Sequence, residues 1–238
     1  MLLALETATD RASVAVGRSE QDAAETSMIG ARRHAASLLS MVSAVLGQAG
    51  TTLDAVTAVV VSDGPGSFTG LRVGASMAKA LVRARGLSLW TAPSLMVRAA
   101  AHARADHVVL AVSDALRGEI YAAAYRFTRS GVVTVMAPTV CRPGEIPNRL
   151  EPPAVIVGDV PAEASETLER WSGRTVVPSP AGAPAARRLL GLVGRPGGAR
   201  EIGEAGTWEP TYGRPAEAQA RWETTHGRPL PDPAGSPR

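Results

Sequence analysis

The feature that most constrains the fold is an internal similarity between two segments that lie roughly half of the chain apart. Residues 4–17 read ALETATDRASVAVG, and residues 111–124 read AVSDALRGEIYAAA. Each segment predicts an apolar strand with an acid near its end, a short polar turn and a return strand of small residues. Two copies at this separation indicate two lobes of related topology, because a solenoid needs shorter and more numerous repeats.

Length and composition set the class of protein. The chain has 238 residues, 45% of them hydrophobic, which is enough to bury a sizeable core. No apolar run approaches the roughly 20 residues of a membrane helix, and Glu6 stands where a signal peptide would still be apolar. The single cysteine, Cys141, excludes an intrachain disulfide and fits a reducing compartment. We therefore expect a cytoplasmic protein without membrane contact.

The net charge of +3 does not predict a nucleic-acid-binding surface. The arginines are dispersed as singles and pairs and never form a run interleaved with aromatic residues. Aromatic residues make up 4% of the chain, so few side chains could stack on bases. Direct contact with nucleic acid is therefore the weaker expectation.

A helix is predicted over residues 34–49, and Gly50 supplies its stop. Its apolar residues follow helical spacing and cover an unusually wide arc: Ala35, Leu38, Leu39, Met41, Val42, Val45, Leu46 and Ala49. A helix with so wide an apolar arc is usually covered on two sides, by its own sheet and by something else.

A glycine-rich loop follows a buried strand at residues 55–61. It consists of Gly64, Pro65, Gly66, Ser67, Phe68, Thr69 and Gly70. The loop lacks the Lys-Ser/Thr of a Walker A motif, the glycine spacing of a dinucleotide fingerprint and the flanking glycines of a nucleophile elbow. Pro65-Gly66 fits a type II turn with positive φ at Gly66. The loop therefore predicts a tight turn into a helix capped by Ser67 or Thr69, which either packs against a neighbour or holds an anion.

The helix after this loop extends to about residue 85. Gly70, Gly74 and Ala78 repeat at four-residue steps, which predicts a shallow groove where another backbone can approach. A strand ending at Trp90 and a helix over 94–103 complete the first half. We divide the chain into an N-terminal lobe (1–105), a C-terminal lobe (106–202) and a Gly/Pro-rich tail (203–238), which we expect to be extended or disordered.

The second half repeats the α/β pattern. Strands are predicted at 108–112, 119–126, 132–140 and 154–157, and helices near 162–171 and 183–192. No histidine pair lies four apart on a predicted helix, so no metal site is expected on this chain.

Four acids lie where a two-lobed ATPase would hold metal-bound phosphates: Glu6, Asp10, Asp114 and Glu119. The glycine-rich loop offers no phosphate-binding lysine, and the late glycines Gly194, Gly197 and Gly198 lie in a Pro- and Arg-rich stretch. We interpret the acids as turn and cap residues or as remnants of an ancestral phosphate loop.

The segment GPGSFTGLRVG (64–74) resembles the TsaB (YeaZ) family of threonylcarbamoyladenosine-biosynthesis proteins. The resemblance extends to LALETATDRASVAV (3–16), AKAL (78–81), SDALRGEIYAAAY (113–125) and EPTYGRPAEAQARWE (209–223). Gly213 departs from the pattern, which has leucine after the tyrosine. The resemblance implies an actin-like ATPase (ASKHA) fold: two ribonuclease-H-like lobes with mixed sheets flanked by helices.

The same resemblance implies that the chain is not an enzyme. The catalytic paralogue, TsaD, binds its metal through two histidines four residues apart, just after the strand that follows the glycine-loop helix. Ser94 and Arg98 stand at these positions here, and neither can replace a neutral imidazole. The chain therefore resembles a pseudoenzyme without a cofactor of its own, whose complex uses ATP and a metal ion on other subunits.

The implied function is that of a dimerisation subunit. It supports threonylcarbamoyl transfer to the adenosine next to the anticodon in tRNAs reading codons that begin with adenine. The implied partners are TsaD and the ATPase subunit TsaE, with a homodimer when the protein is alone and tRNA contacted only through the complex. The predicted interface residues are Leu38, Met41, Val42, Val45, Leu71, Gly74 and Ala78. Two alternatives stay open: an ATP-dependent phosphotransferase of the sugar-kinase type, and a direct tRNA-binding module.

Overall fold

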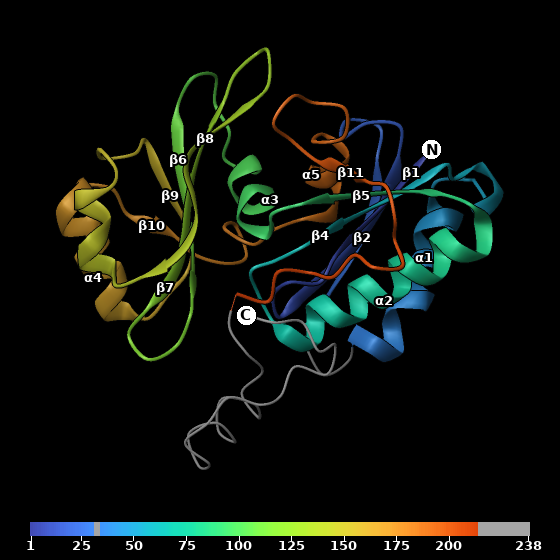
Figure 1. The fold of residues 1–238 in the computed structure, drawn as a ribbon, viewed down its shortest axis with the longest axis horizontal. Helices are drawn as coiled ribbons and strands as arrows, with labels where there is room; N and C mark the ends of the chain where they lie inside the picture. Colours follow the sequence, from blue (N-terminus) through green and yellow to red (C-terminus); the bar gives the residue numbers. More distant parts are fainter. Residues whose placement is uncertain (31–33, 214–238) are drawn as a thin grey trace, which may run out of the picture.

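The computed structural model describes residues 1–30 and 34–213. Within these residues the chain forms two mixed β-sheets with helices on their faces (Figure 1). The strand order is β11-β5-β4-β1-β2-β3 in the first sheet and β10-β9-β6-β7-β8 in the second. No helix in the described part of the chain is long and apolar enough to cross a membrane.

The first sheet begins with an antiparallel meander, as the sequence predicts. Its strands are β1 (Leu2–Glu6), β2 (Arg11–Gly17), β3 (Ala24–Ile29), β4 (Ala58–Ser62), β5 (Ser88–Ala92) and β11 (Arg200–Ile202). The strands β4 and β5 run parallel to β1, and β11 pairs antiparallel with β5. The helices α1 (His34–Gln48) and α2 (Phe68–Arg85) cover one face of this sheet, and a 3-10 turn (Leu53–Ala55) follows α1 (Figure 1).

The second sheet repeats the topology of the first, which confirms the predicted relation between the lobes. Its strands are β6 (Val108–Asp114), β7 (Ile120–Phe127), β8 (Val132–Cys141), β9 (Val155–Asp159) and β10 (Val176–Val177). As in the first sheet, three antiparallel strands are followed by one parallel to the first of them, β9 beside β6. A 3-10 helix (Pro143–Asn148) and α4 (Ala162–Ser172) lie on this lobe. The architecture is the actin-like α/β fold.

Two short helices, α3 (Ser94–Ala100) and α5 (Ala186–Leu190), lie between the sheets (Figure 1). One apolar core joins Val60 of the first sheet, Leu95 and Val97 of α3, and Val109 and Tyr125 of the second sheet. The two lobes therefore share a hydrophobic core in addition to the chain that connects them.

The chain returns to the first sheet before the predicted end of the C-terminal lobe. The backbone N–H of Ala186, in α5, donates to Ser13 Oγ of β2, and β11 adds an edge strand beside β5. The segment predicted as the lobe 106–202 thus supplies the second sheet only as far as β10. The sequence gives no sign of this return, because a three-residue strand is too short to show a period.

The first residues of the predicted tail, 203–213, contain no helix or strand but pack against the first lobe. Trp208 is buried in the core between the first sheet and its outer helices. The rest of the tail prediction, 214–238, lies outside the described residues.

Candidate functional site

The glycine-rich loop is not the predicted type II turn. Positive φ occurs at Gly64 (+101°) and not at Gly66, and the Gly64–Pro65 peptide is cis. Gly66 is required for another reason: a Cβ there would lie 2.4 Å from the carbonyl oxygen of Ala8. Close approach of the β1–β2 turn, and not a left-handed conformation, therefore requires a glycine at position 66.

The polar contacts of the loop are internal. Ser67 caps α2, with its Oγ accepting from Gly70 N at 3.2 Å, which confirms one of the two predicted caps; Thr69 is exposed. Ser67 N donates to Ala8 O at 2.7 Å, and Gly64 N donates to Ser94 Oγ at 3.0 Å. The loop thus ties the start of α2 to the β1–β2 turn and to α3.

The small-residue groove of α2 receives a backbone of its own chain. A Cβ on Gly70 would lie 2.0 Å from Thr7 O, and a Cβ on Gly74 would lie 2.4 Å from Thr7 Oγ1. Ala78 continues this face into the core. The groove is therefore filled by the end of β1 and is not open to a partner.

The prediction for the seven interface residues is also wrong, because their own chain already covers them. All are buried within the single chain: Leu38, Met41, Val42, Val45, Leu71, Gly74 and Ala78. The buried part of the apolar arc of α1 is covered by β2, β3 and α2 of the same chain, whereas Leu39, which also belongs to the arc, is exposed. These residues cannot form the outer surface of the helices.

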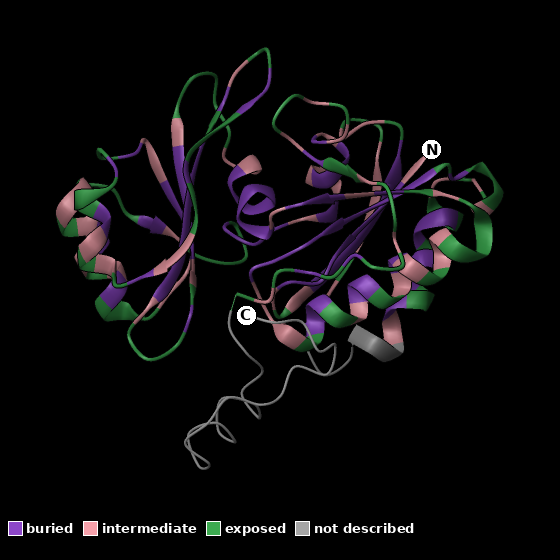
Figure 2. Ribbon diagram, viewed as in Figure 1, coloured by how far each residue is buried: buried purple, intermediate pink, exposed green. Residues whose placement is uncertain are grey.

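The outer surface consists instead of the residues between the buried positions, and sequence reasoning missed it. On α1 the exposed residues include Leu39, Ser40, Ser43 and Ala44; on α2 they include Arg72, Ser76 and Ala80. Figure 2 shows the exposed sides of both helices facing away from the sheet. We call these seven residues the outer helical face. Apart from Leu39 and Arg72 its side chains are small, so another helix could approach closely.

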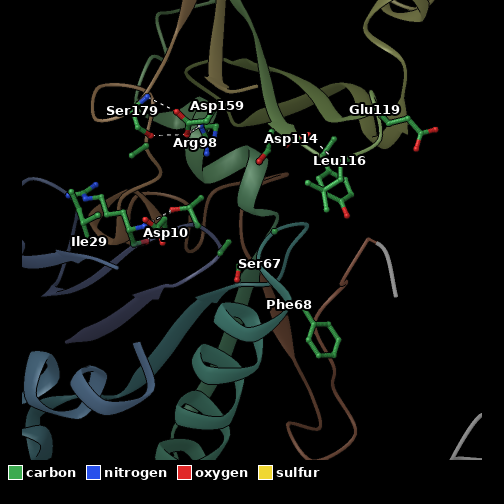
Figure 3. Close-up of a pocket in the computed structure, with 18 of the residues that line it drawn as sticks. Asp10, Ile29, Ser67, Phe68, Arg98, Asp114, Leu116, Glu119, Asp159 and Ser179 are labelled. Carbon is green, nitrogen blue, oxygen red and sulfur yellow. Dashed lines mark hydrogen bonds and ion pairs between the residues drawn. The ribbon is translucent and has the colours of Figure 1, made fainter. Parts of the chain in front are cut away.

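A cleft of about 1430 Å³ lies between the lobes (Figure 3). It brings together Asp10 and Ser67 from the first lobe with Asp114 and Glu119 from the second. Three of the four predicted acids, Asp10, Asp114 and Glu119, therefore line one cleft. Glu6 does not line it, because its side chain is fully buried beneath the β1–β2 turn.

Glu6 and Asp114 make the same local hydrogen bond, which supports their interpretation as turn residues. Glu6 Oε1 accepts from Ala8 N at 2.8 Å, and Asp114 Oδ1 accepts from Leu116 N at 2.7 Å. Burial raises the pKa of Glu6 to about 7, although the hydrogen bond from Ala8, the Ser62 hydroxyl and the charges of Arg98 and Arg11 oppose this rise.

Arg98, at a position the resemblance assigns to a metal-binding histidine, is buried with 2% exposure. Its Nη1 donates to Asp159 Oδ2 at 3.0 Å (Figure 3) and to Gly182 O at 2.8 Å. Burial would raise the pKa of Asp159, but hydrogen bonds from Ser179 and the charge of Arg98 outweigh it and hold that pKa below its usual value. Both Ser94 and Arg98 are thus engaged inside the protein.

The residues present do not fit the ATP–magnesium site of an actin-like fold. No lysine lines the cleft, because the single lysine of the sequence, Lys79 of α2, pairs with Glu209 at 2.6 Å. The late glycines lie elsewhere: a Cβ on Gly197 would lie 2.0 Å from Val132 O. Within residues 1–30 and 34–213, no three His, Cys, Asp or Glu side chains gather as a metal site would require.

Comparison with known proteins gives a consistent family. The family model of TsaD, tRNA N6-adenosine threonylcarbamoyltransferase, matches residues 27–171. The tRNA threonylcarbamoyladenosine biosynthesis protein TsaB of Escherichia coli (strain K12) is 35% identical over 133 residues, which are 55% of this chain and 57% of that protein.

Solved structures agree over a longer stretch. YeaZ from Pseudomonas aeruginosa superposes with a TM-score of 0.71 at 28% identity, covering 88% of this chain and 99% of that one. A Pseudomonas aeruginosa protein described as similar to peptidase YEAZ gives 0.73 at 27% identity, covering 90% and 99%.

The chain spans only a little over half the length of the curated relatives it matches. The match to the family model nevertheless covers more than half of the chain, and it includes the glycine-rich loop, α2, α3 and most of the second lobe. The chain therefore belongs to the tRNA N6-adenosine threonylcarbamoyltransferase (TsaD) family, and the relatives and solved structures that it resembles in that family are TsaB and YeaZ proteins.

Proposed function

We propose that this protein is the non-catalytic scaffold subunit of a tRNA threonylcarbamoyltransferase complex. In that role it supports transfer of threonylcarbamoyl to the adenosine next to the anticodon in tRNAs reading codons that begin with adenine. The observation that carries the proposal is the state of Ser94 and Arg98. Both occupy positions where the catalytic paralogue needs imidazoles, and both are committed to internal hydrogen bonds.

The proposal assigns the chemistry to other subunits. A hydroxyl held by Gly64 N and a guanidinium held by Asp159 offer no neutral nitrogen ligand for a metal ion. The protein then needs no cofactor of its own and works in the cytoplasm, where tRNA is modified. ATP and the metal ion are used by the catalytic subunit TsaD and the ATPase subunit TsaE, and tRNA is contacted only through the complex.

The partner surface in this proposal is the outer helical face. Leu39 on this face is 63% exposed, and the small side chains of Ser40, Ser43 and Ala44 leave the backbone of α1 open to close packing. The same face would pair two copies of the chain when TsaD is absent. One surface used in both ways makes homodimer and heteromer mutually exclusive.

The experiment inserts a charge into this face without touching the core. Ala44→Arg and Ala80→Arg place a guanidinium on the exposed sides of α1 and α2. We expect each variant to keep its circular-dichroism spectrum, to lose TsaD binding by at least about tenfold, and to fail to restore tRNA modification in cells lacking the native copy.

Glu166→Arg, on an exposed position of α4 in the other lobe, is the matched control and should bind normally. Normal binding by both helix variants would rule out this surface. Tight ATP–Mg²⁺ binding by the protein alone would point to the sugar-kinase alternative. Salt-dependent tRNA binding by the protein alone would point to the tRNA-binding alternative.

A further inference from the structure

The chain crosses between the lobes after α3 and again through residues 178–185, which run from β10 to α5. We call residues 178–185 the return linker. In two-lobed proteins that close around a ligand, such crossings absorb the backbone rotation. Contacts that hold a crossing therefore decide whether the lobes can move.

Arg98 holds the return linker and the second sheet at the same time. Its Nη1 donates both to Asp159 Oδ2, at the end of β9, and to Gly182 O, in the linker. In the turn that follows α3, His102 Nε2 lies 2.9 Å from Ala181 O. A planar guanidinium bonded to two segments constrains both, whereas the point charge of a lysine would not.

The linker is also fixed from its other side. Asp159 accepts from Ser179 N at 2.7 Å and from Ser179 Oγ at 2.8 Å. Gly182 N donates to Pro178 O at 2.7 Å, and a Cβ on Gly182 would lie 2.1 Å from Val177 O. The carboxylate of Asp159 thus bridges Arg98 and the start of the linker, and position 182 has no room for a side chain.

The helix that carries Arg98 cannot follow a moving lobe. Leu95, Met96 and Val97 are buried in the core that both sheets share, and Ser94 Oγ is bonded to the glycine-rich loop. Moving one lobe relative to the other would open this core and separate the Arg98 charge from Asp159, which burial makes costly.

We propose that Arg98 clamps the return linker, so that the two lobes move as one body and the cleft keeps a fixed width. The side chain that stands at the metal-ligand position of the paralogue then serves as an interlobe clamp. The proposal goes beyond the scaffold function, because it concerns motion within this chain and does not depend on any partner.

The test measures opening of the linker in the full-length protein by amide hydrogen exchange. In Arg98→Ala, we expect the Ser179, Gly182 and Ala183 amides to exchange at least about tenfold faster, since their hydrogen bonds depend on the clamped linker. Arg98→Lys should show a smaller increase, and Arg170→Ala, an exposed arginine of α4, should show none.

A second readout follows the lobes directly. Spin labels at Ala84→Cys on α2 and Glu166→Cys on α4, with Cys141 replaced by alanine, should give one narrow distance distribution that Arg98→Ala broadens. A folded Arg98→Ala protein with unchanged exchange and an unchanged distribution would overturn the clamp. If Arg98→Ala does not fold, Asp159→Asn decides at Gly182 and Ala183, whose amides do not bond to Asp159: faster exchange there supports the clamp, and unchanged exchange refutes it.

Discussion

The turn between β1 and β2 and the turn between β6 and β7 occupy equivalent places in the two lobes, yet their surroundings differ. In each turn a carboxylate accepts the backbone N–H two residues later, Glu6 from Ala8 and Asp114 from Leu116. The first turn is enclosed by the glycine-rich loop and α2. The second lies at the edge of the cleft with Leu116 60% exposed.

This difference shows that the duplicated strand-turn-strand unit preserves topology but not the use of its turn. In the first lobe, the turn supports α2, and the helix can approach because glycines face it. In the second lobe the turn is free of such packing and adopts left-handed φ values at Leu116 (63°) and Arg117 (57°). Tertiary surroundings, and not the local hydrogen bond, decide what each turn tolerates.

The largest expected effect is steric and falls on the enclosed turn. Gly70→Ala places a methyl group 2.0 Å from Thr7 O, so α2 or β1 must shift. We expect a loss of about 3 kcal/mol in the free energy of unfolding, measured by chemical denaturation. Gly118→Ala, at the open turn, meets no atom within 4 Å and should cost only about 1 kcal/mol, for its positive φ. Equal losses would remove the contrast between the turns.

The second prediction uses the buried carboxyl of the enclosed turn. Because its pKa rises from 4.5 to about 7 on folding, Glu6 stabilises the fold fully below pH 4.5, and this contribution is lost as the pH rises through 7. The loss amounts to at most about 3 kcal/mol. Glu6→Gln should remove this pH dependence and be the more stable protein at pH 8.

Denaturation of both proteins at pH 5 and pH 8 checks the prediction for Glu6. Glu6→Leu should also lose the pH dependence, but it leaves Ala8 N without its acceptor and should be less stable than Glu6→Gln. If Glu6→Gln lowers the free energy of unfolding by the same amount at pH 5 and at pH 8, the carboxyl of Glu6 is ionised in the folded protein.

The smallest effect has the opposite sign and falls on the open turn. Leu116→Gly relieves a left-handed φ of 63° and removes a side chain that is largely in solvent. We expect a gain of about 1 kcal/mol, seen as a higher melting temperature. A loss of stability would mean that Leu116 makes packing contacts that its exposure does not suggest.

Much of the fold could be predicted from the sequence because long elements carry a clear period. The paired strand-turn-strand units, α1, α2 and the longer strands of both sheets lie where alternation and helical spacing place them. The short strands β10 and β11 give no such signal, whereas α5 lies within the helix predicted near 183–192. The return of the chain to the first sheet depends on pairings between residues distant in sequence.

The candidate surface could not be predicted for a different reason. Periodicity identifies the apolar side of α1 but not whether a sheet, a neighbouring helix or a partner covers it. Val42 and Val45 face their own core, and the exposed Ser43 and Ala44 between them carry no hydrophobic signal. Likewise, the role of Arg98 depends on Asp159 and Gly182, which only the folded chain brings within reach.

The scaffold assignment is tested most directly by reconstituting threonylcarbamoyl transfer from purified components. The assay follows a labelled threonylcarbamoyl group into tRNA in the presence of ATP, TsaD and TsaE, with and without this chain. We predict no transfer by this chain alone, transfer when all subunits are present, and loss of transfer when this chain is omitted or carries Ala44→Arg. Transfer by this chain in the absence of TsaD, or undiminished transfer without this chain, would contradict the account.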